Sequence, residues 1–277
     1  MNNKLKKMAT PYLIWLYVLA LAPAVFMFIL MFLDTEGIDT EGLKFTFKNF
    51  AQLKEPSTII ALLNSLKFSI ISTVICILLG YITAYYLYKS HLKNKFLLLT
   101  ILILPMWSNL LLRTQALANI MEPNNIFTSI FNITVKEDAK GLAGSELAII
   151  IGLVFTYLPF MILPIYTALK KIEPMLEEAS LDLGADEFKT FRKVILPLSL
   201  KGVVTGSVMV FLPCMSGFAI PEILGKGNIV MIGNLIEQFF KNMNYNIGSL
   251  LAILILVLIL LSIYLVNKFD KEGETIL

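Results

Sequence analysis

The chain contains 277 residues, of which 57% are hydrophobic and 16% are charged, and its formal net charge is +3. This balance is more apolar than that of a soluble domain and indicates an integral membrane protein. The small positive charge does not indicate a nucleic-acid partner, because the basic residues follow a pattern that membrane orientation explains.

Six apolar runs approach the length of about 20 residues that a helix needs to cross a bilayer. In chain order they cover residues 12–33, 61–88, 96–120, 147–169, 202–224 and 247–266. We therefore predict an all-α fold. It should be a polytopic membrane protein with six transmembrane helices that form a single transmembrane domain over residues 1–277.

The distribution of basic residues predicts the orientation of these spans. A cleaved signal peptide is an alternative for the first run, but that run is longer than a signal core, so we expect a span. Lysine and arginine are twice as numerous in the segments on the N-terminal side of the membrane as in the opposite loops. The positive-inside rule then predicts that both termini lie in the cytoplasm.

The sequence offers no catalytic cluster. His91 is the only histidine, and no cysteine or carboxylate cluster lies near it at metal-ligand spacing. The tripeptide Gly-Lys-Gly at 225–227 lacks the flanking residues of a phosphate-binding loop. We predict no catalytic residue, metal site or bound cofactor in this chain, and therefore no enzyme activity of its own.

The energy source of a transporter is a further constraint. Inspection finds neither paired carboxylates at mid-span nor an inverted repeat, either of which would support a secondary transporter. An ATPase partner is therefore expected. A secondary transporter or channel is the alternative class.

A charged segment, EEASLDLGADEFKTFRKVILPL, follows the fourth run and starts at Glu177. Pro174 suits the first turn of a helix, and Gly184 can adopt the left-handed conformation that ends one. Asp186 suits the cap of a second short helix, and Pro197 predicts a bend before the fifth span. An amphipathic hairpin that lies on lipid headgroups is the alternative interpretation.

This segment resembles the EAA signature of inner-membrane permease subunits of ABC importers. The matching residues are Glu178-Ala179-Ser180, Gly184-Ala185, Phe191, Val194 and Leu196-Pro197. The resemblance implies the type I ABC importer permease fold. It also implies that residues 171–199 form a cytoplasmic coupling loop, which docks in a cleft of an ATPase subunit.

The resemblance implies particular residues for docking. Glu178, Ala179 and Gly184 would form the docking core, and Leu183, Phe188 and Phe191 would brace it. Ser180 stands where the family usually has alanine. The full set of predicted ATPase-coupling residues is Glu177, Glu178, Ala179, Ser180, Leu183, Gly184, Ala185, Phe188, Phe191, Leu196 and Pro197.

Three further runs are similar to the spermidine/putrescine branch of these permeases, in particular its B-type subunit. They are residues 104–109 followed by Arg113, residues 157–161 with Pro164, and residues 220–225. Permeases of importers for ferric ions, phosphonates and other small cations are related, so another cargo remains the alternative.

A polyamine crossing the membrane needs acidic, carbonyl or aromatic partners, because its charges are costly in a medium of low dielectric constant. The alternative for each aromatic residue is packing or lipid contact. The predicted translocation path is formed by Trp107, Asn109, Tyr157, Phe160, Phe218 and Glu222.

The resemblance also implies the partners of the chain in a bacterial inner membrane. They are a second, C-type permease subunit and a dimeric cytoplasmic ATPase, which would bind the ATP and Mg. An extracellular or periplasmic polyamine-binding protein would deliver the substrate, and membrane lipid would surround the spans. The acidic loop 34–55 could meet the binding protein, although a solvated loop is the simpler interpretation.

Overall fold

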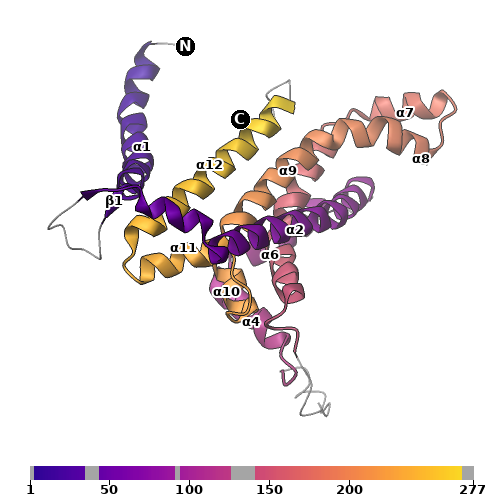
Figure 1. Ribbon diagram of the computed structural model, residues 1–277. Coiled ribbons are helices and arrows are strands. Elements are labelled where there is room, and N and C mark those ends of the chain that lie inside the picture. The colour runs from indigo at the N-terminus through magenta and orange to yellow at the C-terminus, as the bar shows by residue number, and fades with distance from the viewer. Residues whose placement is uncertain (1–2, 35–43, 91–93, 126–140, 270–277) are drawn as a thin grey trace. The chain divides into compact units, whose positions relative to one another are not determined.

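The computed structural model describes residues 3–34, 44–90, 94–125 and 141–269 (Figure 1). The chain divides into two compact units. One comprises Met1–Ala61 with Leu235–Leu260, and the other comprises Leu62–Asn234 with Leu261–Leu277. His91 and residues 35–43 of the acidic loop, which include Glu36, Asp39 and Glu41, lie outside the described residues.

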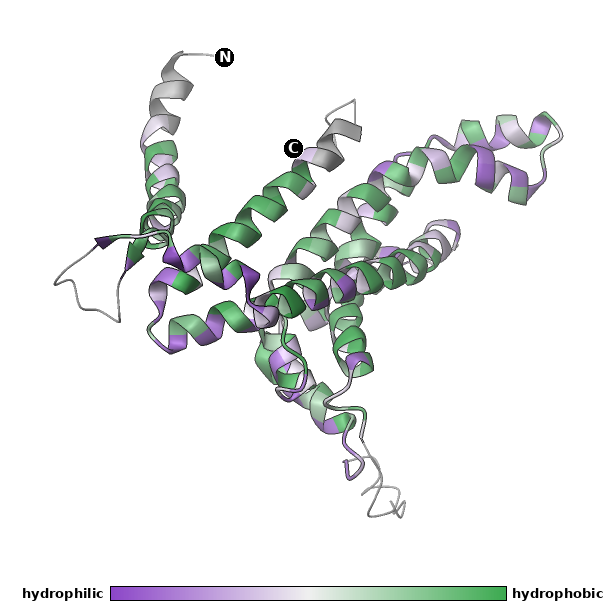
Figure 2. Ribbon diagram, in the orientation of Figure 1, coloured by the Kyte–Doolittle hydropathy of each residue, from purple (hydrophilic) through white to green (hydrophobic). Residues whose placement is uncertain are grey.

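Five helices of the described part are long and apolar enough to cross a membrane: Thr10–Leu30, Pro56–Lys89, Glu146–Lys170, Glu187–Ser216 and Tyr245–Tyr264. A sixth span is obtained if a bent pair, Leu97–Trp107 and Leu110–Ile120, crosses as one. The predicted all-α architecture is therefore confirmed, with six spans when the bent pair is counted as one. Figure 2 shows hydrophobic residues along α2, α6, α9 and α12, and many hydrophilic residues at α7 and α8.

The first unit contains α1 (Asn3–Leu30), β1 (Leu33–Asp34), β2 (Lys44–Phe45) and the 3-10 helix η1 (Lys48–Lys54). The two short strands pair antiparallel, with Leu33 opposite Phe45. Asn49 is buried, and its amide donates to the carbonyls of Met31 and Leu33. Its side-chain oxygen accepts from Asn246 at 3.2 Å, which joins η1 to α12.

The second unit contains α3 (Lys95–Ile103), η2 (Leu104–Trp107), α4 (Leu110–Ile120), α6 (Glu146–Lys170), α7 (Pro174–Asp182), α8 (Glu187–Thr190), the π-helical turn η3 (Phe191–Ile195), α9 (Leu196–Ser216) and α10 (Ala219–Gly225). Residues of α2 (Pro56–Lys89), α11 (Ile232–Lys241) and α12 (Tyr245–Phe269) occur in both units.

Helices α6 and α9 form the core of the second unit, and two glycines allow their close approach. A Cβ atom at Gly202 would lie 2.6 Å from the carbonyl oxygen of Pro164. A Cβ atom at Gly206 would lie 2.7 Å from Sδ of Met161, which is itself fully buried. Small residues spaced four apart let membrane helices pack backbone to backbone.

The third apolar run, 96–120, forms a broken span rather than one straight helix. Its two helical parts meet at an angle of 93°. Pro105 begins the break, because proline cannot donate the backbone hydrogen bond of a continuing helix. Asn109 then caps α4 by accepting from the amides of Leu111 and Leu112, at 2.9 and 3.3 Å.

Two expectations about the fifth run are wrong. The run 202–224 is interrupted, because α9 ends at Ser216 and α10 begins at Ala219 after an extended Gly217. The predicted bend at Pro197 is absent, since Glu187–Ser216 is continuous. Pro197 lies in the first turn of α9, and the π-helical turn η3 directly before it accommodates the missing backbone donor.

Candidate functional site

Residues 174–190 form a helical hairpin of α7 and α8, which we call the hairpin (Figure 1). Pro174 begins α7 as predicted. The helix ends in a Schellman motif, in which the amide of Gly184 donates to Leu181 and that of Ala185 donates to Ser180. Gly184 has φ of +83°, a left-handed conformation that glycine adopts without steric cost.

The second arm of the hairpin begins at Asp186, as the sequence predicted. Its carboxylate accepts from the amide of Lys189 at 2.7 Å and pairs with the ammonium group of the same residue at 3.1 Å. The backbone hydrogen bond from Lys189, followed by its side-chain bond, lowers the pKa of Asp186 below its ordinary value. The cap is therefore charged at neutral pH.

A hydrogen bond holds the two arms together. The hydroxyl groups of Ser180 and Thr190 lie 3.0 Å apart, and Thr190 is buried. Ser180 is the residue that departs from the family pattern. In this chain its hydroxyl therefore contributes a contact across the hairpin that alanine would lack.

The tip of the hairpin presents large apolar side chains to the surroundings. Leu183 is 88% exposed and Phe188 is 70% exposed. These two residues were expected to brace the loop, but they bury little surface within this chain. Phe191 alone of the three fits that description. Exposed apolar side chains of this size mark an interaction surface.

Hairpin residues also bond to the end of α2. Tyr88 donates to Oε1 of Glu177 at 2.6 Å, and the ammonium group of Lys89 pairs with Oε2. Burial opposes ionisation of Glu177, but the hydrogen bonds from Lys89 and Tyr88 outweigh it, so the pKa of this carboxyl is lowered. Glu177 therefore remains ionised in the structure.

Aromatic side chains extend this contact along α2. The ring of Phe191 lies edge-on to Tyr85 and Tyr81, with centroids 5.0 and 5.9 Å away. The hydroxyl of Tyr81 is 2.8 Å from that of Ser199 in α9. No role was predicted for Tyr81, Tyr85 or Tyr88. Their spacing of four and three residues on one helix face was a signal that could have found them.

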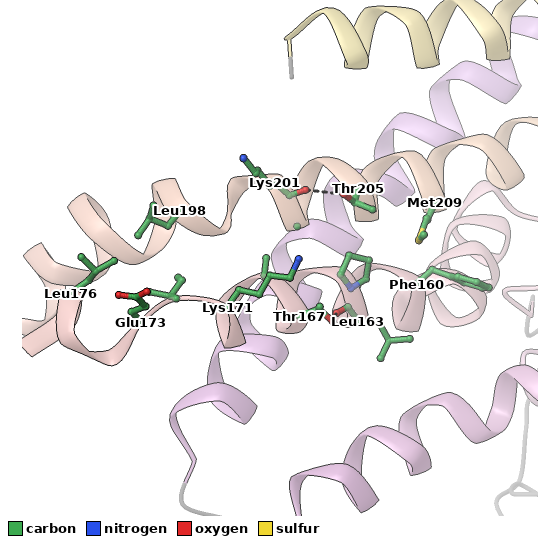
Figure 3. Close-up of a pocket in the computed structure, with 14 residues that line it drawn as sticks. Phe160, Leu163, Thr167, Lys171, Glu173, Leu176, Leu198, Lys201, Thr205 and Met209 are labelled. Atoms are coloured by element: carbon green, nitrogen blue, oxygen red, sulfur yellow. Dashed lines mark hydrogen bonds between the residues drawn. The ribbon is translucent and has the colours of Figure 1, made fainter. Parts of the chain in front are cut away.

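A groove of about 1030 Å³ runs along α6 and α9 beside the hairpin (Figure 3). Lys171, Glu173 and Lys201 lie toward the hairpin, whereas Phe160 and Met209 lie farther along the two helices. Of the predicted path residues, Phe160 lines this groove. The charged residues of the groove thus lie at the hairpin end, together with Leu176 and Leu198, and the far end is apolar.

Two predicted path residues lie at the break of the third run. Trp107 is 87% exposed, and Asn109 is the cap of α4. Arg113 spans the break by donating to the carbonyl of Pro105 at 2.5 Å. Asn109 and Arg113 therefore have a structural function at this position, while the ring of Trp107 is available for contacts.

The other path residues lie near the break between α9 and α10. Tyr157 of α6 is within 4 Å of the position that a Cβ atom at Gly217 would occupy. Asn234 donates to the carbonyl of Phe218 at 2.9 Å and to Oε2 of Glu222 at 3.1 Å. The structure thus brings Tyr157, Phe218 and Glu222 to one break. Asn234 was not predicted, because no local pattern marks it as a partner of Glu222.

No group of three or more His, Cys, Asp or Glu that could hold a metal ion occurs within residues 3–34, 44–90, 94–125 and 141–269.

Comparison with known proteins identifies relatives over the full length of the chain. The spermidine/putrescine transport system permease protein PotB of Haemophilus influenzae is 34% identical over 273 residues, which cover 98% of this chain and 96% of that protein. PotB of Escherichia coli is 33% identical over 229 residues, 82% of this chain and 83% of that protein.

Solved structures of low sequence identity share the fold. A chain of a bacterial alginate ABC transporter, in complex with an alginate pentasaccharide-bound periplasmic protein, has a TM-score of 0.79 at 17% identity and matches 98% of this chain and 95% of its own. A chain of the MetNI methionine ABC transporter has a TM-score of 0.58 at 21% identity. This match covers 78% of the present chain and 97% of the transporter chain.

The family model described as "Binding-protein-dependent transport system inner membrane component" matches residues 77–272, which include the hairpin and both breaks. The chain is therefore a member of this family of multi-pass inner-membrane transport components.

Proposed function

We propose that this chain is the B-type permease subunit of an ATP-driven polyamine importer, with spermidine and putrescine as substrates. It would lie in a bacterial inner membrane with both termini and the hairpin in the cytoplasm. The observation that carries this proposal is the relationship over nearly the whole chain to a permease named for spermidine and putrescine. The low content of basic residues in the opposite loops supports the orientation.

The hairpin would dock on the ATPase. Leu183 and Phe188 are exposed at its tip, and burial of such side chains in a partner's cleft is favourable. The partner would be a dimeric ATPase that binds ATP and Mg, while this chain contributes no cofactor site. Closure of the ATPase dimer would displace the hairpin, and hydrolysis would allow its return.

The substrate would pass the two helix breaks. Glu222 supplies a negative charge near the end of the fifth span, and the exposed ring of Trp107 can attract an ammonium group by a cation–π interaction. Freed carbonyls at broken helices are tolerated where they line a cavity. A C-type permease would form the other half of the path, and an external binding protein would deliver the polyamine.

The test is uptake by a reconstituted complex. The chain is placed in liposomes with its second permease and with the ATPase and Mg-ATP inside, and the binding protein and labelled polyamine are added outside. We expect uptake that requires both ATP and the ATPase. Concentrative uptake by the purified chain alone would instead assign it to secondary transporters. ATP-driven uptake of a different cation or of a phosphonate, without polyamine uptake, would overturn the proposed cargo.

A further inference from the structure

Resting on the proposed function, we propose that Glu177 is a positioning residue that passes movement of the hairpin to α2 through its contacts with Tyr88 and Lys89. Helices α6 and α9 are joined to the hairpin by the chain itself, because α7 follows α6 and η3 leads into α9. Helix α2 ends much earlier in the sequence. It can follow the hairpin only through side-chain contacts.

The geometry of Glu177 suits this role. Both of its carboxylate oxygens bond to α2, one to the hydroxyl of Tyr88 and the other to the ammonium group of Lys89. Its side chain is only 13% exposed, whereas that of Lys89 is 47% exposed, so the carboxylate is the sheltered partner of the ion pair. Hydrogen bonds to an ionised group are stronger and more directional than those between neutral groups.

The same arrangement argues against direct docking by Glu177. Its oxygens face α2, whereas Glu178 and Asp182 on the same helix are exposed. An ATPase that grips the tip of the hairpin at Leu183 would therefore move Glu177 without touching it, and Glu177 would pull on Tyr88 and Lys89.

Further along α2, other contacts complete the connection. Phe191 lies against Tyr85 and Tyr81, and Tyr81 reaches Ser199. Deeper in the span, a Cβ atom at Gly80 would lie 2.8 Å from Cγ of Met161 in α6, so the two helices are in close contact there. Helix α2 is thus held at its end and along its side, and packed structure of this kind transmits displacement.

The experiment compares coupling in the reconstituted complex. In Glu177→Gln and Tyr88→Phe, the ATPase should still assemble with the permease. We expect the amount of substrate imported per ATP hydrolysed to fall by at least about fivefold, the lower end of typical coupling between sites. Tyr88→Phe removes one hydroxyl group and keeps the ring, so it provides a second variant if Glu177→Gln folds poorly.

The matched control is Asp182→Asn, which removes a negative charge from an exposed position of the same helix and should leave the ratio unchanged. Lys89→Met combined with Glu177→Gln should be no worse than either single change, because the three residues act as one unit. Exchange of the charges in Glu177→Lys with Lys89→Glu should restore part of the ratio. This rescue would show that the ion pair itself, and not the identity of either residue, maintains the ratio.

A second readout does not need transport. Hydrogen exchange of the amides in α7 and at the end of α2 is measured with and without trapped nucleotide on the ATPase. Nucleotide should change exchange in both helices of the unmodified protein, but only in α7 of Glu177→Gln. If α2 responds equally in both proteins, or if Glu177→Gln fails to bind the ATPase, the proposal is overturned. A failure of polyamine uptake by the unmodified complex would contradict the proposed function instead, and the exchange experiment would still decide this inference.

Discussion

Gly184 ends α7 with φ of +83°, and no heavy atom of the chain lies within 4 Å of the position that a Cβ atom would take. A side chain there meets no clash. The left-handed conformation nevertheless costs an L-residue about 1–2 kcal/mol. Such a cost changes the population of the native turn by a factor of about 5–30.

We therefore expect Gly184→Ala to reduce ATP-driven uptake several-fold while membrane insertion and the amount of protein stay unchanged. Gly227→Ala is the matched control, because Gly227 has φ of +76° and is equally unobstructed but lies outside the hairpin. Uptake assays and quantitative immunoblots of membranes measure both properties. Equal uptake by the two variants would contradict a requirement for the turn geometry.

Glu222 is the residue whose charge can be tested most directly. Glu222→Gln keeps an oxygen that can accept from Asn234, but it removes the negative charge. An attraction of about 1 kcal/mol, typical of an exposed ion pair, corresponds to an effect of about fivefold. We expect polyamine-stimulated ATPase activity of the complex to fall by this amount.

The control for Glu222 is Glu146→Gln, which removes an equal charge at the start of α6, where Glu146 pairs with Lys67. Unchanged stimulation in Glu222→Gln, or an equal loss in both variants, would exclude a specific contribution of Glu222 to the path.

At the scale of elements, the contact between α6 and α9 depends on Gly202 and Gly206. A larger side chain at Gly206 would overlap Met161, and overpacking of this kind costs about 1–3 kcal/mol. Gly206→Leu should therefore lower the thermal midpoint of the purified permease. Ser207→Leu is the control, since Ser207 lines a groove of about 450 Å³ that has room for the added atoms. Equal midpoints would show that the helices separate at little cost.

The exposed tip of the hairpin leads to a prediction about affinity. Burial of one leucine or phenylalanine side chain contributes about 1.5–3 kcal/mol. Leu183→Ser or Phe188→Ser should therefore weaken binding of the ATPase by about tenfold or more. Leu142→Ser, at a half-exposed position outside the hairpin, should have no effect. Binding is measured with the permease in nanodiscs, and full affinity in the Leu183 and Phe188 variants would place the docking surface elsewhere.

Local signals in the sequence predicted the hairpin well, because its structure depends on neighbouring residues. Pro174, Gly184 and Asp186 each act within one turn of the chain, and each lies where its chemistry predicts. The breaks were harder to predict, because mean hydropathy does not respond to backbone direction. Pro105 lies next to the break of the third run, but Pro159, Pro164 and Pro213 lie inside helices, so the presence of a proline alone does not locate a break.

Pro197 and the contacts of α2 were missed for related reasons. A proline at the start of a helix and a proline at a bend have the same local sequence, and only the preceding π-helical turn distinguishes them. The contacts of Glu177 with Tyr88 and Lys89 join residues far apart in the chain. They arise from tertiary packing, which no local pattern reports.

At the scale of the whole molecule, the orientation of the chain in the membrane can be tested with two single cysteines. Cys76 and Cys214 are fully buried, so they should react slowly and can be replaced by alanine in the parent protein. In intact cells, a membrane-impermeant maleimide should label Gln238→Cys but should label Lys193→Cys only after permeabilisation. Both positions are exposed. The reverse pattern would invert the topology.

The uninterrupted helix Glu187–Ser216 has a mechanical consequence. Its 30 residues, at about 1.5 Å per residue, make a rod about 45 Å long that includes the π-helical turn η3. A tilt of about 10° at the hairpin would swing the opposite end of such a rod through about 8 Å. That end is Ser216, directly before the interruption near which Tyr157, Phe218 and Glu222 lie. On the proposed topology, work done by the ATPase at the hairpin would thereby reach the proposed translocation path at the far end of the helix.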